Sequence, residues 1–118
     1  YGSLMRQFVI DGAELLTTIT NDAWYGRSSA AYQHWDQASM RSIENGRYLA
    51  RAANTGISGF VDPYGRVPAK SNLFEQKVLV QDVRLSQERT TYAKFGDVTA
   101  WVSLAFTTAA LLASWRLR

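Results

Sequence analysis

The chain has 118 residues, of which 47% are hydrophobic and 13% aromatic, so it is large enough for one domain core and is not a disordered polar tail. Its formal net charge of +3 does not by itself indicate a nucleic-acid partner, because the cationic residues are spread along the chain. The sequence contains no cysteine, which excludes a disulfide framework, a cysteine zinc site and a thiol nucleophile within these residues.

The first half of the sequence predicts helices that alternate with a strand. Residues 4–10 carry apolar side chains at helical spacing, and Asp11-Gly12 then ends the predicted helix. Residues 14–20 are rich in β-branched side chains, which predicts a buried strand. Residues 33–45 predict an amphipathic helix. Its less polar side would carry Trp35, Ala38, Ser39, Ser42 and Ile43.

The second half predicts a run of short strands. Residues 48–53 and 57–61 are separated by an Asn-Thr-Gly turn, and residues 62–65 form a proline-containing β-turn that ends in glycine. We expect residues 66–69 to return as the next strand of a hairpin and residues 77–83 to form a further strand. This order of elements predicts a mixed α/β layer.

Residues 98–115 contain no charged side chain and are followed by Arg116 and Arg118. As a helix, eighteen residues rise roughly 27 Å, close to the thickness of the hydrocarbon core of a bilayer. The cationic end and Trp115 match the cytoplasmic flank of a membrane helix. Five serine and threonine residues make the run only moderately apolar, so a core helix of a soluble protein is the alternative.

The sequence lacks the common signatures of metal and phosphate sites. His34 is the single histidine and has no cysteine or second histidine as a co-ligand, so we expect it to be a surface or hydrogen-bonded side chain. Gly56 and Gly59 are not followed by the Lys-Ser/Thr pair of a phosphate-binding loop. No serine has the glycine spacing of a nucleophile elbow. We therefore predict no metal and no cofactor.

A polar and aromatic cluster follows the predicted strand at residues 14–20. In α/β layers, sites are usually built at the carboxyl ends of strands, so this loop is a candidate wall of a substrate site. The alternative is a turn stabilised by its own side chains with an aromatic lid over the core. The candidate substrate-binding residues are Asn21, Asp22, Trp24 and Tyr25.

Glu44 and Arg47 flank Gly46 at the end of the predicted helix at residues 33–45. One interpretation is an ion pair at the helix end, which contributes little to stability when it is exposed. The other is a charge pair at the border of a pocket, where an arginine could bind a carboxylate or phosphate. Spacing alone leaves both open.

Three motifs in this order carry a resemblance to a known family: TNDAWYG, RSIENGRYLARAANTG, and TTYAKFGD just before the apolar run. Together they resemble the C-terminal part of the apolipoprotein N-acyltransferases, a membrane-bound branch of the nitrilase superfamily. The resemblance implies an α/β fold, in which residues 1–96 are the C-terminal portion of a nitrilase-like αββα sandwich and residues 97–118 are one transmembrane helix. It also implies a monomer in the bacterial inner membrane, with the nitrilase-like domain on the periplasmic side and the C-terminus in the cytoplasm.

The reaction implied by the resemblance transfers an acyl chain from a phospholipid to the N-terminal cysteine of a diacylated apolipoprotein. It proceeds through a thioester on a cysteine, with a glutamate base and a lysine that stabilises the oxyanion. That cysteine would belong to a Cys-Tyr-Glu motif a few residues before Tyr1, so we expect no catalytic residue in this chain and no activity from it alone.

The resemblance assigns supporting roles to residues that are present. The loop with Asn21, Asp22 and Trp24 would border the acyl-enzyme pocket, while Glu44 and Arg47 would order the loop and helix beneath it. Two other functions stay open. One is a soluble nitrilase-type amidohydrolase, in which water resolves the thioester, and the other is a non-catalytic, membrane-anchored binding module.

Overall fold

The computed structural model describes residues 1–116 and begins with helix α1 (Gly2–Ile10), which is followed by strand β1 (Leu15–Asn21). Met5 and Val9 lie four residues apart on α1, so both face the core and are buried. Leu16 is the buried residue of β1. The predicted helix at residues 4–10 and the predicted strand at residues 14–20 are thus confirmed.

A short 3₁₀ turn, η1 (Ala23–Tyr25), leads into α2 (Ser29–Asn45). The hydroxyl of Ser28 accepts a hydrogen bond from the Ala30 N–H at 3.3 Å, so the helix begins four residues earlier than predicted. Gly46 ends α2 with φ 63°, a conformation that glycine adopts without a steric penalty. Trp35, Ala38 and Ser42 are buried as expected, whereas Ile43 is 52% exposed.

Strands β2 (Tyr48–Asn54), β3 (Gly59–Val61) and β4 (Ala69–Lys70) complete a sheet with the order β1-β2-β3-β4. β1 and β2 are parallel because α2 forms the crossover between them, and the other two pairs are antiparallel. The prediction for β2 is confirmed, and β3 is shorter than predicted. The strand predicted at residues 66–69 is displaced, because β4 begins at Ala69 and residues 66–68 are not strand. The expected turn at residues 62–65 is present, with a hydrogen bond from the Gly65 N–H to the Asp62 carbonyl at 3.0 Å.

The prediction of a strand at residues 77–83 is wrong. This segment has no strand assignment, and Val78 and Val80 are 90% and 88% exposed. A strand needs a neighbour to pair with, and among the described residues none offers this segment a hydrogen-bonded ladder. Its β-branched side chains therefore did not suffice to make it a strand.

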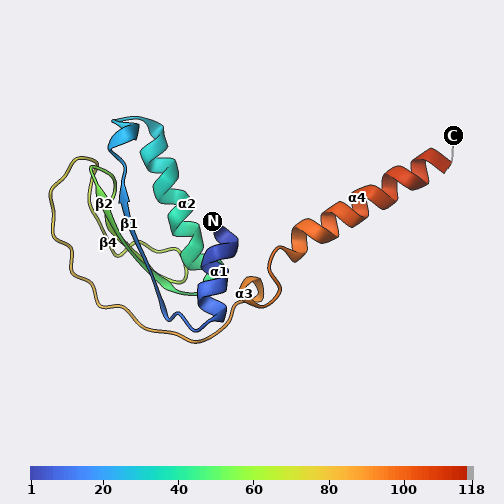
Figure 1. The fold of residues 1–118 in the computed structure, drawn as a ribbon, viewed down its shortest axis with the longest axis horizontal. Coiled ribbons are helices and arrows are strands. Elements are labelled where there is room, and N and C mark those ends of the chain that lie inside the picture. The colour runs from blue at the N-terminus through green and yellow to red at the C-terminus, as the bar shows by residue number, and fades with distance from the viewer. Residues whose placement is uncertain (117–118) are drawn as a thin grey trace.

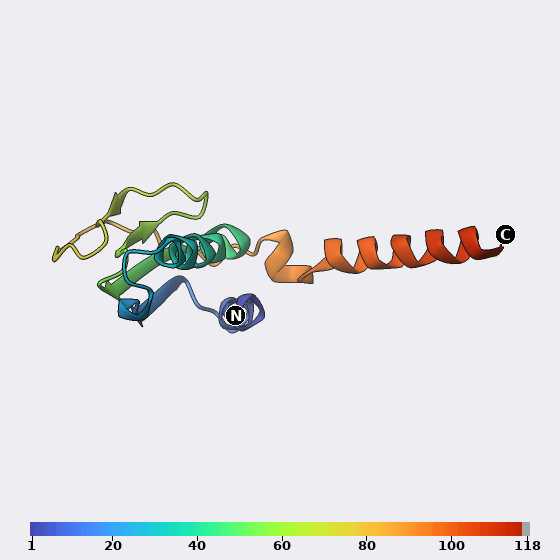
Figure 2. The same cartoon turned by 90° about the horizontal axis from the view of Figure 1, so that it is seen from above.

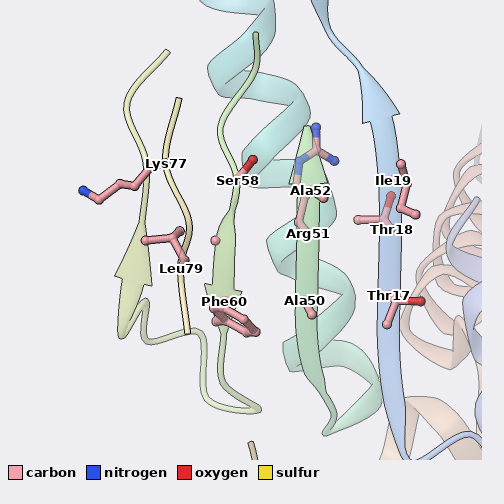
Figure 3. Close-up of a pocket in the computed structure, with 11 residues that line it drawn as sticks. Thr17, Thr18, Ile19, Ala50, Arg51, Ala52, Ser58, Phe60, Lys77 and Leu79 are labelled. Carbon is pink, nitrogen blue, oxygen red and sulfur yellow. The ribbon is translucent and has the colours of Figure 1, made fainter. Parts of the chain in front are cut away.

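The helices cover only one face of the sheet. The core between them and the strands contains Trp35 of α2, Leu16 of β1 and Leu49 of β2, together with residues of α1 and α3. The opposite face is open, and Ile19 on it is 89% exposed. Figure 3 shows the shallow groove on this face, lined by Thr17, Ala50, Phe60 and Leu79 among others.

After a long extended segment, α3 (Thr91–Phe95) docks on α1, and α4 (Val98–Arg116) then projects away from the rest of the molecule (Figures 1 and 2). Arg6 of α1 donates to the carbonyls of Tyr92 and Lys94 at 3.1 and 3.0 Å. Within the described chain, α4 has no buried residue and is long and apolar enough to cross a membrane, with a mean hydropathy of 1.5. The part of the prediction that concerns Arg118 lies outside the described residues.

Candidate functional site

The loop that follows β1 is fixed at its start by an Asx turn. The side-chain oxygen of Asn21 accepts hydrogen bonds from the Ala23 N–H and from the side-chain amide of Asn54, each at 3.1 Å. Asn21 and Asn54 are partners in the parallel register of β1 and β2. The carboxyl ends of the two strands are therefore joined where the candidate loop begins, and Asn21 itself is exposed.

Asp22 lies beneath this loop and is only 2% exposed. Its Oδ2 accepts from Nη2 of Arg51 at 2.9 Å, and both side chains of this ion pair are buried. Its Oδ1 accepts from Nδ1 of His34 at 2.8 Å and from the Thr20 hydroxyl at 3.2 Å. A buried carboxylate with this set of donors is fully satisfied, as a buried charge must be to persist in a folded protein.

His34 is joined to Asp22 by a side-chain hydrogen bond. An ionised carboxylate can only accept, so the 2.8 Å contact is donated by the Nδ1–H of His34. Nη2 of Arg51 also lies 3.1 Å from Nδ1, so the three side chains form one compact cluster. The prediction that His34 is a hydrogen-bonded side chain is thus confirmed.

The two aromatic residues of the loop face outward. The side chain of Trp24 is 86% exposed, and that of Tyr25 is 40% exposed. The Tyr25 ring stands edge-on to the His34 ring, with centroids 5.8 Å apart. The structure therefore brings Asn21, Trp24 and Tyr25 to the surface of the loop and places Asp22 underneath them.

Gly56 makes the closest approach to this cluster. A Cβ atom at position 56 would lie 2.2 Å from Oδ2 of Asp22, a distance that no side chain tolerates. Thr55, the residue before Gly56, has a φ of 60°, which is unusual for a β-branched residue. Gly56 and Arg51 are not among the site residues predicted from the sequence. The parallel pairing of β1 with β2, which places Thr18 beside Arg51, is the feature that brings Arg51 under the loop.

Glu44 and Arg47 do not form an ion pair with each other, which was one of the two interpretations left open by their spacing. Glu44 pairs instead with Arg41, one turn earlier on α2, with a distance of 2.6 Å between Oε1 and Nη2. Both Glu44 Oε2 and Arg41 Nε are buried without a hydrogen-bond partner among the described residues. Burial raises the pKa of Glu44; the charge of Arg41 opposes this shift and that of Asp97 adds to it.

Arg47 is 1% exposed and binds backbone carbonyls. It donates to Ala13 at 2.8 Å and to Glu88 at 2.5 Å, and also to the carbonyls of Asn45 and Gly46. Burial lowers its pKa from the ordinary value. Because its guanidinium is occupied, Arg47 is not the free arginine fork that a pocket for a carboxylate or phosphate would need. Its contacts join the start of β1, the end of α2 and the segment before α3.

The groove of Figure 3 lies on the open sheet face and not at the loop of residues 21–26. Its lining combines small and apolar side chains, such as Ala50, Ala52 and Leu79, with the polar side chains of Arg51 and Lys77. Within residues 1–116, no group of three or more histidine or acidic side chains is arranged to hold a metal ion.

Residues 1–93 match the family model described as carbon-nitrogen hydrolase. The chain belongs to the carbon-nitrogen hydrolase family. Among its curated relatives are three proteins named apolipoprotein N-acyltransferase. The one from Geobacter metallireducens is 45% identical over 105 residues, that from Methylococcus capsulatus 45% over 82, and that from Rickettsia prowazekii 40% over 112. These matches cover 89%, 70% and 90% of this chain but only 20%, 16% and 22% of the relatives. This member of the carbon-nitrogen hydrolase family thus spans about a fifth of the length of those proteins, and the resemblance to them inferred from the motifs is confirmed.

Proposed function

We propose that the chain is part of an apolipoprotein N-acyltransferase, in which it forms one side of the acyl-enzyme pocket and a membrane anchor. The observation that carries this proposal is the extent of the similarity. The match to the Rickettsia prowazekii protein covers 90% of the chain and leaves only about a tenth of the residues outside it. The match therefore extends beyond residue 93, where the match to the family model ends, and into α4. The relatives from Geobacter metallireducens and Rickettsia prowazekii, whose matches include both parts, are named apolipoprotein N-acyltransferase.

The proposed reaction has two halves. In the first, a cysteine thiolate attacks an ester carbonyl of a phospholipid, so that a thioester forms and a lysophospholipid leaves. In the second, the α-amino group of the diacylated cysteine of an apolipoprotein attacks the thioester, so that an amide forms and the thiol is regenerated. We assign the cysteine, the glutamate base and the oxyanion-stabilising lysine to the part of the protein that precedes Tyr1, and we expect residues 1–118 alone to be inactive.

The exposure of α4 supports a membrane location. Trp101, Phe106 and Leu111 are each at least 67% exposed, and a large exposed apolar surface marks a site of contact with a membrane or another protein. We propose that residues 97–118 span the bacterial inner membrane with the C-terminus in the cytoplasm. Residues 1–96 then belong to a nitrilase-like domain on the periplasmic side, and the full-length protein is a monomer.

The open face of the sheet supports the αββα arrangement. Ile19 is 89% exposed there, opposite Ala52 in the register of β1 and β2, and both residues line the groove of Figure 3. Sheets normally bury such a face against a second layer. We propose that the second sheet of the sandwich, built from the preceding part of the protein, covers it. Asn21, Trp24 and Tyr25 would then border the acyl-enzyme pocket, and Glu44 and Arg47 would support it.

The match to the carbon-nitrogen hydrolase model also makes an amidohydrolase the second candidate. The test is to incubate the purified full-length protein with labelled phospholipid alone and to look for a hydroxylamine-sensitive label on the protein. The acyltransferase retains the label as a thioester until an amine acceptor is added. An amidohydrolase either remains unlabelled or releases free fatty acid without an acceptor, and this result would refute the proposal. Replacement of the upstream cysteine by alanine is the control.

A further inference from the structure

We propose that His34, Arg51 and Gly56 are positioning residues that hold the loop of residues 21–26 in its working conformation through the buried carboxylate of Asp22. The inference rests on the proposed function, because it takes this loop to be a wall of the acyl-enzyme pocket. It goes beyond that function in assigning Asp22 a place beneath the wall. It also assigns roles to His34, Arg51 and Gly56, none of which is among the site residues predicted from the sequence.

Asp22 is unavailable to a substrate. The residue is 2% exposed, and both of its oxygens accept short hydrogen bonds from side chains of the chain itself. A ligand that approached it would have to displace Arg51 or His34 and leave a buried charge without its partner, which is strongly unfavourable. Asp22 therefore acts on the loop and not on the substrate.

The backbone of Asp22 connects the sheet to the aromatic residues of the loop, Trp24 and Tyr25. Its N–H donates to the Asn54 carbonyl at 3.1 Å, and its carbonyl accepts from the Tyr25 N–H at 3.0 Å. Trp24 lies between these two contacts and is 86% exposed, so side-chain packing within the described chain does little to fix it. The place of Trp24 thus depends on the backbone around it, which Asp22 anchors from below.

Side chains from two layers of the fold hold the carboxylate of Asp22 in place. His34 comes from α2 and Arg51 from β2, so Asp22 is held by both the helix layer and the sheet. Arg51 is itself fixed by a hydrogen bond from Nε to the Ile57 carbonyl at 3.2 Å. The missing side chain at Gly56 leaves the space that the carboxylate occupies. A change at any of these positions moves Asp22 while it leaves the exposed loop residues chemically intact.

The experiment uses the full-length protein and four variants. His34→Leu removes the donor to Asp22, whereas His34→Asn keeps a side-chain N–H near the position of Nδ1. Gly56→Ala introduces the Cβ that collides with Oδ2 of Asp22. Arg66→Gln is the matched control, because Arg66 also pairs with an aspartate but is 76% exposed and distant from the loop in the hairpin turn. Two measurements are made on each: steady-state acyl transfer, normalised to the amount of trapped acyl-enzyme, and hydrogen exchange of the backbone amides at residues 20–28.

We expect His34→Leu and Gly56→Ala to raise KM for the lipid substrates about tenfold with kcat nearly unchanged, because a displaced wall weakens binding without touching the reacting atoms. Exchange at residues 21–26 should accelerate in the same two variants, and His34→Asn should restore both values. A merely structural role would lower the yield of folded enzyme and leave KM of the folded fraction unchanged, and this result would overturn the inference. If the wild-type protein transfers no acyl group, the proposed function fails, while the exchange data still decide whether these residues hold the loop.

Discussion

Replacing Arg47 by methionine should loosen the junction between the sheet layer and the segment that leads to α4. Methionine keeps an unbranched apolar side chain of similar reach in a site that is 1% exposed, but it removes every donor. Two of the lost hydrogen bonds are long-range contacts, to the Ala13 carbonyl at 2.8 Å and to the Glu88 carbonyl at 2.5 Å. The other two are local contacts at the end of α2 and count for less.

The expected magnitude follows from these two long-range bonds. A hydrogen bond from a charged donor contributes about 1.5–3 kcal/mol, so their loss should cost about 3–4 kcal/mol after partial rehydration of the carbonyls. Such a change raises the population of the locally opened state roughly 100-fold or more. The assay is limited trypsin digestion of the full-length protein in detergent, with cleavage after Arg84 and Arg89 followed by mass spectrometry, since cleavage of a transiently opened segment tracks that population.

Two further variants of the full-length protein make this prediction specific. Arg47→Lys keeps the charge, but its compact ammonium cannot reach all of these carbonyls, so cleavage should be intermediate. Arg66→Met removes an exposed arginine that is paired with a single aspartate, and cleavage at Arg84 and Arg89 should be unchanged. If Arg47→Met raised this cleavage less than about fivefold, equivalent to about 1 kcal/mol, the account of Arg47 as a clamp between three segments would be wrong.

Two other predictions concern Glu44 and α4. Burial raises the pKa of Glu44 above its ordinary value of 4.5, so the folded state retains this proton longer than the unfolded state. Protonated Glu44 makes its full contribution to the free energy of unfolding below pH 4.5, and this contribution is lost as the pH rises through the raised pKa. Glu44→Gln should therefore flatten the fall in stability above pH 4.5, measured by urea titration of the full-length protein, and a curve parallel to that of the wild type would contradict this. Ala109→Lys places a charge near the middle of α4 at a cost of about 2.5–3.5 kcal/mol for membrane insertion. It should expose the C-terminus to labelling from the periplasmic side, and an unchanged labelling pattern would argue against a membrane span.

Local patterns in the sequence predicted most of the helices and strands. The apolar spacing of α1, the β-branched run of β1 and the glycine after α2 act over a few residues, and the structure confirms all three elements. The strand predicted at residues 77–83 failed for the opposite reason. Whether an extended segment becomes a strand depends on a partner, and the sequence of the segment does not contain that partner.

In the candidate site, too, the sequence predicted the features that depend on neighbouring residues and missed those that depend on distant ones. The position of the loop at the end of β1 followed from the sequence, because a strand end and an Asx turn are local features. Spacing left open an ion pair between Glu44 and Arg47, and Glu44 pairs instead with Arg41, three residues earlier on the same helix. The cluster beneath the loop joins Asp22 to a residue 29 positions later, Arg51. That contact depends on the parallel register of β1 and β2, which no local pattern encodes.

The most direct test of the central claim is the mass of the acceptor's N-terminal peptide after reaction with the full-length protein. A diacylated lipopeptide is incubated with phospholipid and the protein, and the peptide is analysed by mass spectrometry. The account predicts the gain of one acyl chain as an amide on the α-amino group, with one lysophospholipid released for each amide formed. An unmodified peptide together with free fatty acid would contradict it and would show that water, not the lipoprotein amine, resolves the thioester.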